Sequence, residues 1–219
     1  MRDSLKVLTL CLLLIGTIGP SNAAEYEVEI LVYAHVQGSA GDERWPVPRE
    51  WPPVERALSL GEAGTHSVDT RALQAIADNL RGSRQYRPVL HWRWRQPGWN
   101  QAGAKPVHIQ IPAGSALPLT SPPALLDKTL LARLRTLIAQ RQPAPPEQPL
   151  LDGTVSLSVT QFPHLSVDLV YMDKDTGLPV QLRETRRMPV GELHYLDHPR
   201  FGVLAQVTAV NPGSGNNIP

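Results

Sequence analysis

The chain has 219 residues, of which 42% are hydrophobic and 19% are charged. These values exclude a chain that is disordered throughout, because enough apolar side chains are present to build a core. The 21 Lys and Arg residues almost balance the 20 Asp and Glu residues, which leaves a net charge of +1 at pH 7. A nearly neutral chain is not expected to bind nucleic acid, since phosphate binding requires a surplus of positive charge.

The N-terminal residues 1–23 have the three parts of a secretory signal peptide. Arg2 and Lys6 make the first segment positive, and residues 7–18 are apolar. Ser21-Asn22-Ala23 then provides small residues for a cleavage site. The apolar run is too short for a permanent membrane span. We therefore predict a cleaved leader, a periplasmic location and a mature chain that does not span a membrane.

Cys11 is the only cysteine of the chain, and it lies inside this leader. The mature chain is therefore expected to have no disulfide, no thiolate metal ligand and no cysteine nucleophile. A lipid anchor on Cys11 is disfavoured because Leu10 precedes it, where a lipoprotein signal needs a small residue. Export without cysteine is typical of a bacterial periplasmic protein that depends on packing alone.

The first two thirds of the mature chain alternate between strands, loops and helices. Period-two alternation predicts a strand from Tyr26 to Tyr33, and a loop rich in Gly and Pro follows over residues 37–53. A helix is expected over Val68–Leu80, with Gly82 ending it. The next predicted elements are strands over Tyr86–Arg95 and Val107–Ile111, a helix over Ser121–Ile138, and an extended connector over Gln142–Pro149.

The last third shows the most regular alternation and predicts strands joined by short turns. These strands are centred on Val155–Val159, Leu165–Tyr171, Val180–Met188 and Val203–Val210, with a hairpin turn at Asp173–Gly177. Consecutive strands without intervening helices favour antiparallel pairing. We predict one α+β domain over residues 24–212, a single, largely antiparallel β-sheet with two helices on one face. A disordered tail is expected over 213–219.

The strand over Tyr86–Arg95 carries an informative pattern. Trp92 and Trp94 share one face of this strand, while Arg93 and Arg95 share the other. The two tryptophans are either buried in the core or exposed as a platform for sugar stacking. If they are buried, the two arginines remain on the opposite, accessible face.

A cluster of polar side chains follows the strand that ends at Met188. His194, Asp197 and His198 could bind a metal if the segment were helical, which would support a metal-dependent hydrolase. Nearby Gly and Pro residues instead favour a turn. In that case His194, Tyr195, Asp197 and His198 form a rigid hydrogen-bonded corner, or a surface that binds a partner. Motifs of serine and zinc hydrolases do not occur in the sequence, so we expect no catalytic residue, metal or cofactor.

Three stretches of the chain are distinctive: Tyr86–Pro97, Gly153–Tyr171 and Leu182–Val203. The third contains Arg186-Arg187-Met188, the run from Glu192 to Pro199, and Phe201-Gly202-Val203. Together they resemble the CsiV family of periplasmic, peptidoglycan-binding, cell-shape-integrity proteins. This resemblance implies a non-enzymatic accessory protein that binds peptidoglycan. It also implies activation of a class A penicillin-binding protein together with its outer-membrane lipoprotein activator. A scaffold that binds only envelope proteins remains an alternative.

The resemblance does not place the binding residues, but ligand chemistry suggests candidates. Muropeptides carry carboxylates on their stems and apolar faces on their sugars, so a binding site needs arginines beside an aromatic surface. The first predicted site consists of Arg93, Arg95, Gln96 and Trp99. The second consists of Arg186 and Arg187. The sequence leaves open whether glycan or stem peptide is bound.

Overall fold

The computed structural model describes residues 24–36, 45–63, 72–115, 117 and 148–210. The predicted signal peptide, the second predicted helix and the predicted tail lie outside these ranges, and they stay predictions. The described part of the predicted loop over 37–53, from Trp45 onward, is irregular, as expected.

The described residues contain nine strands and one helix. In chain order they are β1 (Glu25–His35), β2 (Leu58–Ser59), α2 (Gln74–Gly82), β3 (Tyr86–Pro97), β4 (Val107–Ile111), β5 (Leu151–Val159), β6 (Pro163–Met172), β7 (Pro179–Arg187), β8 (Leu193–His198) and β9 (Phe201–Val210).

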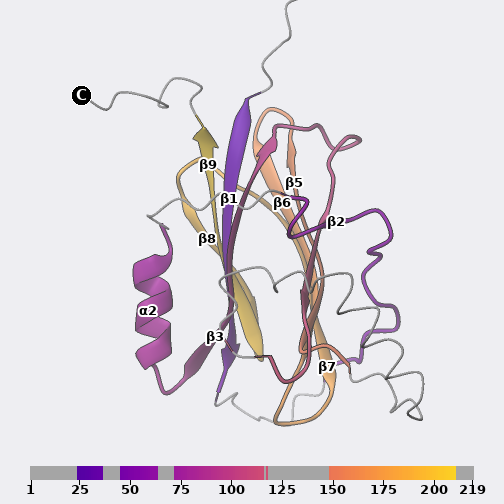
Figure 1. Ribbon diagram of the computed structural model, residues 1–219, viewed down its shortest axis with the longest axis vertical. Helices are drawn as coiled ribbons and strands as arrows, with labels where there is room; N and C mark the ends of the chain where they lie inside the picture. Colours follow the sequence, from indigo (N-terminus) through magenta and orange to yellow (C-terminus); the bar gives the residue numbers. More distant parts are fainter. Residues whose placement is uncertain (1–23, 37–44, 64–71, 116, 118–147, 211–219) are drawn as a thin grey trace, which may run out of the picture.

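The strands form two sheets that face each other (Figure 1). Sheet A has the order β3-β1-β9-β8, and sheet B has the order β2-β4-β5-β6-β7. All pairs are antiparallel except β2 with β4. The predicted antiparallel character is therefore confirmed. The prediction of a single sheet is wrong, and one of its two helices is found among the described residues. Each sheet has one apolar face, and packing the two together buries both.

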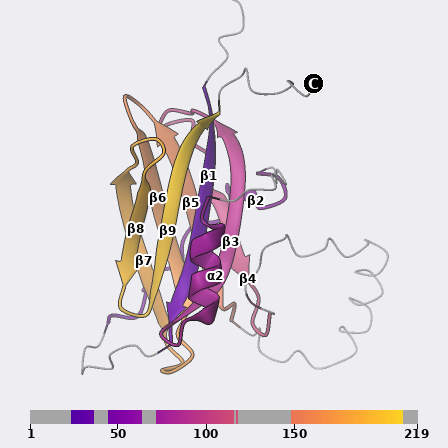
Figure 2. The ribbon, with the colours of Figure 1, turned by 90° about the vertical axis from the view of Figure 1, so that its left-hand side faces the viewer.

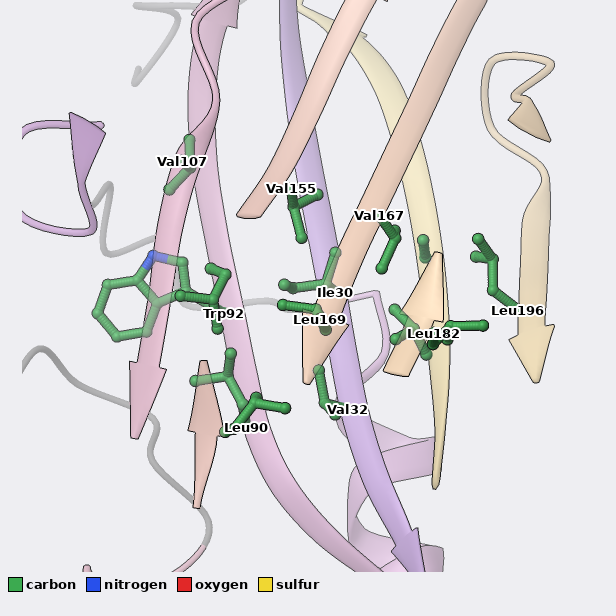
Figure 3. Packing of buried hydrophobic residues seen from close by; sticks show 14 of the residues in the cluster. Ile30, Val32, Leu90, Trp92, Val107, Val155, Val167, Leu169, Leu182 and Leu196 are labelled. Atoms are coloured by element: carbon green, nitrogen blue, oxygen red, sulfur yellow. The ribbon is translucent and has the colours of Figure 1, made fainter. Parts of the chain in front are cut away.

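The core lies between the two sheets (Figure 3). Ile30, Val32 and Trp92 project from sheet A, and Val155 and Leu169 project from sheet B. All five side chains are buried in one hydrophobic cluster, which makes the two sheets parts of one packed unit. Trp94 is buried in the same cluster. The two tryptophans of β3 are therefore core residues, and the sugar-stacking alternative for them is wrong.

Helix α2 covers part of the outer face of sheet A, as Figure 2 shows. Leu73, just before the helix, and Ala77 within it are buried against Leu31 of β1. Leu204 of β9 packs at the margin of this second, smaller cluster. The helix therefore leaves β8, at the edge of the sheet, uncovered (Figure 2).

The turn between β6 and β7 has the predicted position. The N–H of Gly177 donates to the carbonyl of Asp173 at 2.8 Å, and Gly177 has a φ of 68° that favours glycine. By contrast, the sequence prediction missed β8. Gly191 and Pro199 flank this strand and end it, but they do not lie within it. The predicted rigid corner over His194–His198 is thus the first strand of the β8–β9 hairpin.

Candidate functional site

The first predicted binding site is divided by the structure. Arg93 lies on the outer face of sheet A, but its side chain is only 5% exposed. Its Nη1 donates to Glu27 Oε1 at 3.1 Å, and Arg95 Nε donates to the second oxygen of the same carboxylate at 3.0 Å. The expectation that Arg93 is accessible is therefore wrong. β1 places Glu27 and Glu29 beside β3, so the charges of this face are paired across the two strands.

Glu29 extends this buried charge network to the helix. One of its oxygens lies 2.6 Å from His91 Nε2, and the carboxylate accepts the backbone N–H groups of Ala72 and Leu73 at 2.9 and 3.2 Å. Burial alone raises the pKa of Glu29, but the bonds from His91 and the backbone outweigh it and hold the pKa below its ordinary value. Since these N–H groups precede α2, the carboxylate fixes the start of the helix on the sheet.

The other residues of the first predicted site lie closer together. Arg95, Gln96 and Trp99 line a small cavity of about 200 Å³ between β3 and β4. Gln96 is buried there, where it accepts a hydrogen bond from Trp94 Nε1 at 2.9 Å and donates to the carbonyl of Leu157 at 3.0 Å. Gln96 thus joins the two sheets, which leaves it little freedom to bind a ligand.

The second predicted site is also divided, because Arg186 and Arg187 project from opposite faces of β7. Arg186 Nη1 donates to the carbonyl of Tyr195 at 2.6 Å, and its Nη2 lies 2.5 Å from Glu184 Oε1. Arg186 therefore ties the edge of sheet B to β8. Arg187 lies on the outer face of sheet B, with its guanidinium carbon 3.4 Å from the centroid of the Phe162 ring.

A larger hollow of about 440 Å³ lies on the outer face of sheet B. Its walls come from β5, β6, β7 and the segment before β4, and its lining is mostly polar and contains no Asp, Glu, Lys or Arg. The lining residues are Gln101, Ala104, Pro106, Ser156, Ser158, Thr160, His164, Ser166 and Thr185. Five of these nine side chains are hydroxyls, so the hollow can both donate and accept hydrogen bonds. We refer to it as the hydroxyl hollow.

Strand register brings these side chains together. Ser158, His164 and Arg187 are cross-strand neighbours in one row, so Arg187 lies next to the hydroxyl hollow. Ser166 and Thr185, in the next row, are joined through their hydroxyl oxygens at 2.9 Å. His164 Nδ1 donates to the carbonyl of Phe162 at 2.9 Å, because a carbonyl can only accept. In the neutral ring, Nε2 is therefore an acceptor.

The sequence interpretation missed this hollow. Ser156, Ser158 and Ser166 lie on the polar face of their strands. The available signal is that these polar positions carry small hydroxyls rather than charges. Their alignment across β5 and β6 depends on the pairing register of these two strands, which the sequence alone does not show.

The metal-site hypothesis fails on geometry. His194 and His198 share one face of β8 but stand roughly 13 Å apart along an extended strand, and Asp197 projects from the opposite face. Three ligands of one metal cannot be so arranged. Within the residues that the structure describes, no group of three or more His, Cys, Asp or Glu side chains could hold a metal ion.

The buried arginine–carboxylate contact next to β8 involves Asp173 and not Asp197. Arg200, in the β8–β9 turn, donates through Nε and Nη2 to Asp173 Oδ2 at 2.9 and 2.5 Å, and both side chains are buried. Burial raises the pKa of Asp173, but hydrogen bonds from Thr176 and Arg200 outweigh it and hold the pKa below its ordinary value. Asp197 instead lies at the surface, 3.7 Å from His35 Nε2.

Comparison with known proteins identifies the family. No curated protein and no solved structure matches the chain. Among the described residues, no helix has the length and apolar character needed to cross a membrane. A family model described as "Peptidoglycan-binding protein, CsiV" matches residues 6–210, which is nearly the whole chain. The chain therefore belongs to the CsiV family of peptidoglycan-binding proteins.

Proposed function

We propose that this protein is a non-enzymatic periplasmic protein that binds peptidoglycan through the hydroxyl hollow. The observation that carries the proposal is the hydroxyl-rich lining, without Asp, Glu, Lys or Arg, of a hollow of about 440 Å³ on an exposed sheet face. Its size falls in the range of ordinary ligand sites. Family membership supplies the ligand, since the family is described as binding peptidoglycan.

The chemistry of the hollow suits the sugar part of this polymer. Hydroxyl and acetamido groups of a glycan strand can exchange hydrogen bonds with Ser156, Ser166 and Thr185. His164 Nε2 offers a further acceptor. Arg187 lies beside the hollow in the same strand row as His164, where its cation can pair with a carboxylate of the peptide stem. The hydroxyl hollow thus favours the glycan, with the peptide stem lying toward Arg187.

Co-sedimentation of the mature chain with isolated sacculi tests the proposal. The wild-type protein should pellet at low and moderate salt. The double variant Ser166→Ala/Thr185→Val, which removes two hydroxyls of the hollow, should pellet several-fold less. Thr154→Val is the matched control, because Thr154 lies on the same face of β5 outside the lining. A wild-type protein that stays in the supernatant would rule out peptidoglycan binding.

We further propose, from the family resemblance, that the protein activates a class A penicillin-binding protein together with its outer-membrane lipoprotein activator. The test is a reconstituted glycan-polymerisation assay with the synthase and the lipoprotein, with and without this protein. A higher rate on addition supports the proposal. A pull-down that recovers the lipoprotein but no muropeptide would instead support a scaffold that binds only proteins.

A further inference from the structure

The outer face of sheet A carries an aromatic cluster at the end of β1. Tyr33 lies nearly parallel to His35 and to Tyr195 of β8, with ring centroids 5.7 and 6.3 Å apart and interplanar angles of 7° and 10°. Tyr86 of β3 packs edge-on against Tyr33 at 5.5 Å. The cluster therefore joins three strands of the sheet, and nothing in the proposed function uses it.

Gly202 of β9 makes this arrangement possible. β9 lies between β1 and β8, and a Cβ atom at Gly202 would stand 2.4 Å from Tyr33 Oη and 2.7 Å from Tyr33 Cζ. The Tyr33 ring therefore lies directly over the backbone of β9 and reaches Tyr195 on the next strand. Because Tyr33 is itself buried, it holds the Tyr195 ring against a fixed surface.

The exposed part of the cluster lies on β8, which α2 leaves open (Figure 2). Tyr195 is 42% exposed, and the side chain of Asp197, two residues along the same face, is 44% exposed. Burial and a hydrogen bond to Asp197 raise the pKa of Tyr195 to about 12, so the phenol stays protonated. Leu193 continues the exposed apolar surface along the strand.

We propose that Tyr195 and Asp197 form a second binding site, which takes a pyranose ring of a glycan strand on the face of the sandwich opposite the hydroxyl hollow. The identity of the polymer rests on the proposed function, but the site uses different residues. A pyranose ring presents an apolar C–H face that packs on an aromatic ring, and its hydroxyls donate to a carboxylate. The negative charge of Asp197 disfavours the anionic stem peptide, so a neutral sugar fits better.

Two sites on opposite faces have a consequence for wall binding. A rigid sandwich that holds one sugar segment on each outer face can contact two neighbouring glycan strands at once. Attachment of the first strand then raises the effective concentration of the second. Loss of either site should weaken binding to the intact wall more than binding to a short soluble sugar.

The test uses tri-N-acetylchitotriose, a soluble sugar without stem peptide, and follows backbone amide shifts of the full mature chain by NMR. We expect shifts at Leu193–Asp197 and Gly202, separate from those of the hydroxyl hollow. Tyr195→Ala should weaken the β8 response about threefold to tenfold, the scale of one aromatic contact. Trp51→Ala, at another exposed aromatic residue, is the control and should leave this response unchanged.

Two further measurements keep the inference separable from the proposed function. Tyr195→Phe retains the ring and should respond much as the wild type does. It therefore tests the role of the ring without depending on the folding of Tyr195→Ala. Asp197→Asn should weaken the response by removing the charged acceptor. Shifts confined to the hydroxyl hollow would overturn the second site while leaving the proposed function intact. Sacculus binding that is unchanged in Tyr195→Ala would also contradict it.

Discussion

The outer faces of the two sheets differ in how they use polar side chains. On sheet A, Glu27, Glu29 and Arg93 are largely buried and paired with one another or with the start of α2. On sheet B, Ser156 and Ser166 line an open hollow. Both faces come from strands with the same period-two alternation.

The difference shows that alternation identifies a non-core face without saying what that face does. A buried carboxylate with several hydrogen bonds stabilises the fold, since removing it leaves buried donors without their acceptor. Small hydroxyls at an open surface contribute little to stability and stay available for a ligand. The following four predictions test this contrast.

The largest effect is expected at Glu29. Glu29→Ala leaves His91 and two backbone N–H groups without their carboxylate, and should lower the free energy of unfolding by about 3–5 kcal/mol. Urea denaturation followed by circular dichroism measures it. Glu192→Ala is the control, because its side chain is 65% exposed, and it should unfold like the wild type. A loss below about 1 kcal/mol for Glu29→Ala would contradict the view that the buried charges of sheet A stabilise the fold.

A smaller loss is expected where the two sheets are joined. Asp173→Ala leaves the buried Arg200 without its main partner and should destabilise the protein by about 2–4 kcal/mol. Asp175→Ala is the matched control, because Asp175 also contacts Arg200 but is largely exposed. A double-mutant cycle with Arg200→Met measures the coupling between the two side chains. Equal losses from Asp173→Ala and Asp175→Ala would show that the buried pair has no special role.

The buried carboxylates also predict how stability depends on pH. Glu29 and Asp173 both have a pKa below the ordinary value. Their contribution is therefore fully present above the unfolded-state pKa of about 4, and it is lost as the pH falls through the lower folded-state values. Burial lowers the pKa of His35 and His198, so the urea midpoint should already fall as the pH drops below about 6.5, where these side chains are charged only in the unfolded chain. The two carboxylates should add a further fall below about pH 4. In Glu29→Gln this fall should be shallower, and a fall of equal steepness would exclude Glu29 as a source.

The smallest effect is expected at the hydroxyl hollow. Ser166→Ala and Thr185→Val each remove one partner of a solvent-accessible hydrogen bond. The free energy of unfolding should therefore change by no more than about 0.5 kcal/mol. Thermal unfolding measures this in the same variants that are used for sacculus binding. A loss above about 1.5 kcal/mol would mean that these hydroxyls serve the fold, as the charges of sheet A do.

Local sequence patterns predicted most of the strands and one important feature of the core. Val107–Ile111 is a strand with these bounds, and the turn at Asp173–Gly177 lies where Gly177 indicated it. The same face of β3 carries Trp92 and Trp94, and both are buried. These features depend on local periodicity and on glycine conformation, which neighbouring residues determine. The distinctive strings also pointed to the family that the match over residues 6–210 shows.

What each sheet face packs against depends on long-range contacts. Arg93 was expected to be accessible, but its side chain is buried and forms an ion pair with Glu27 of β1. Arg186 and Arg187 are adjacent in sequence, yet one ties β7 to β8 and the other lies beside the hydroxyl hollow. The strands among the described residues divide into two sheets, and the register between β5, β6 and β7 aligns the hydroxyls. Such contacts join residues far apart in the chain, so local sequence patterns carry no record of them.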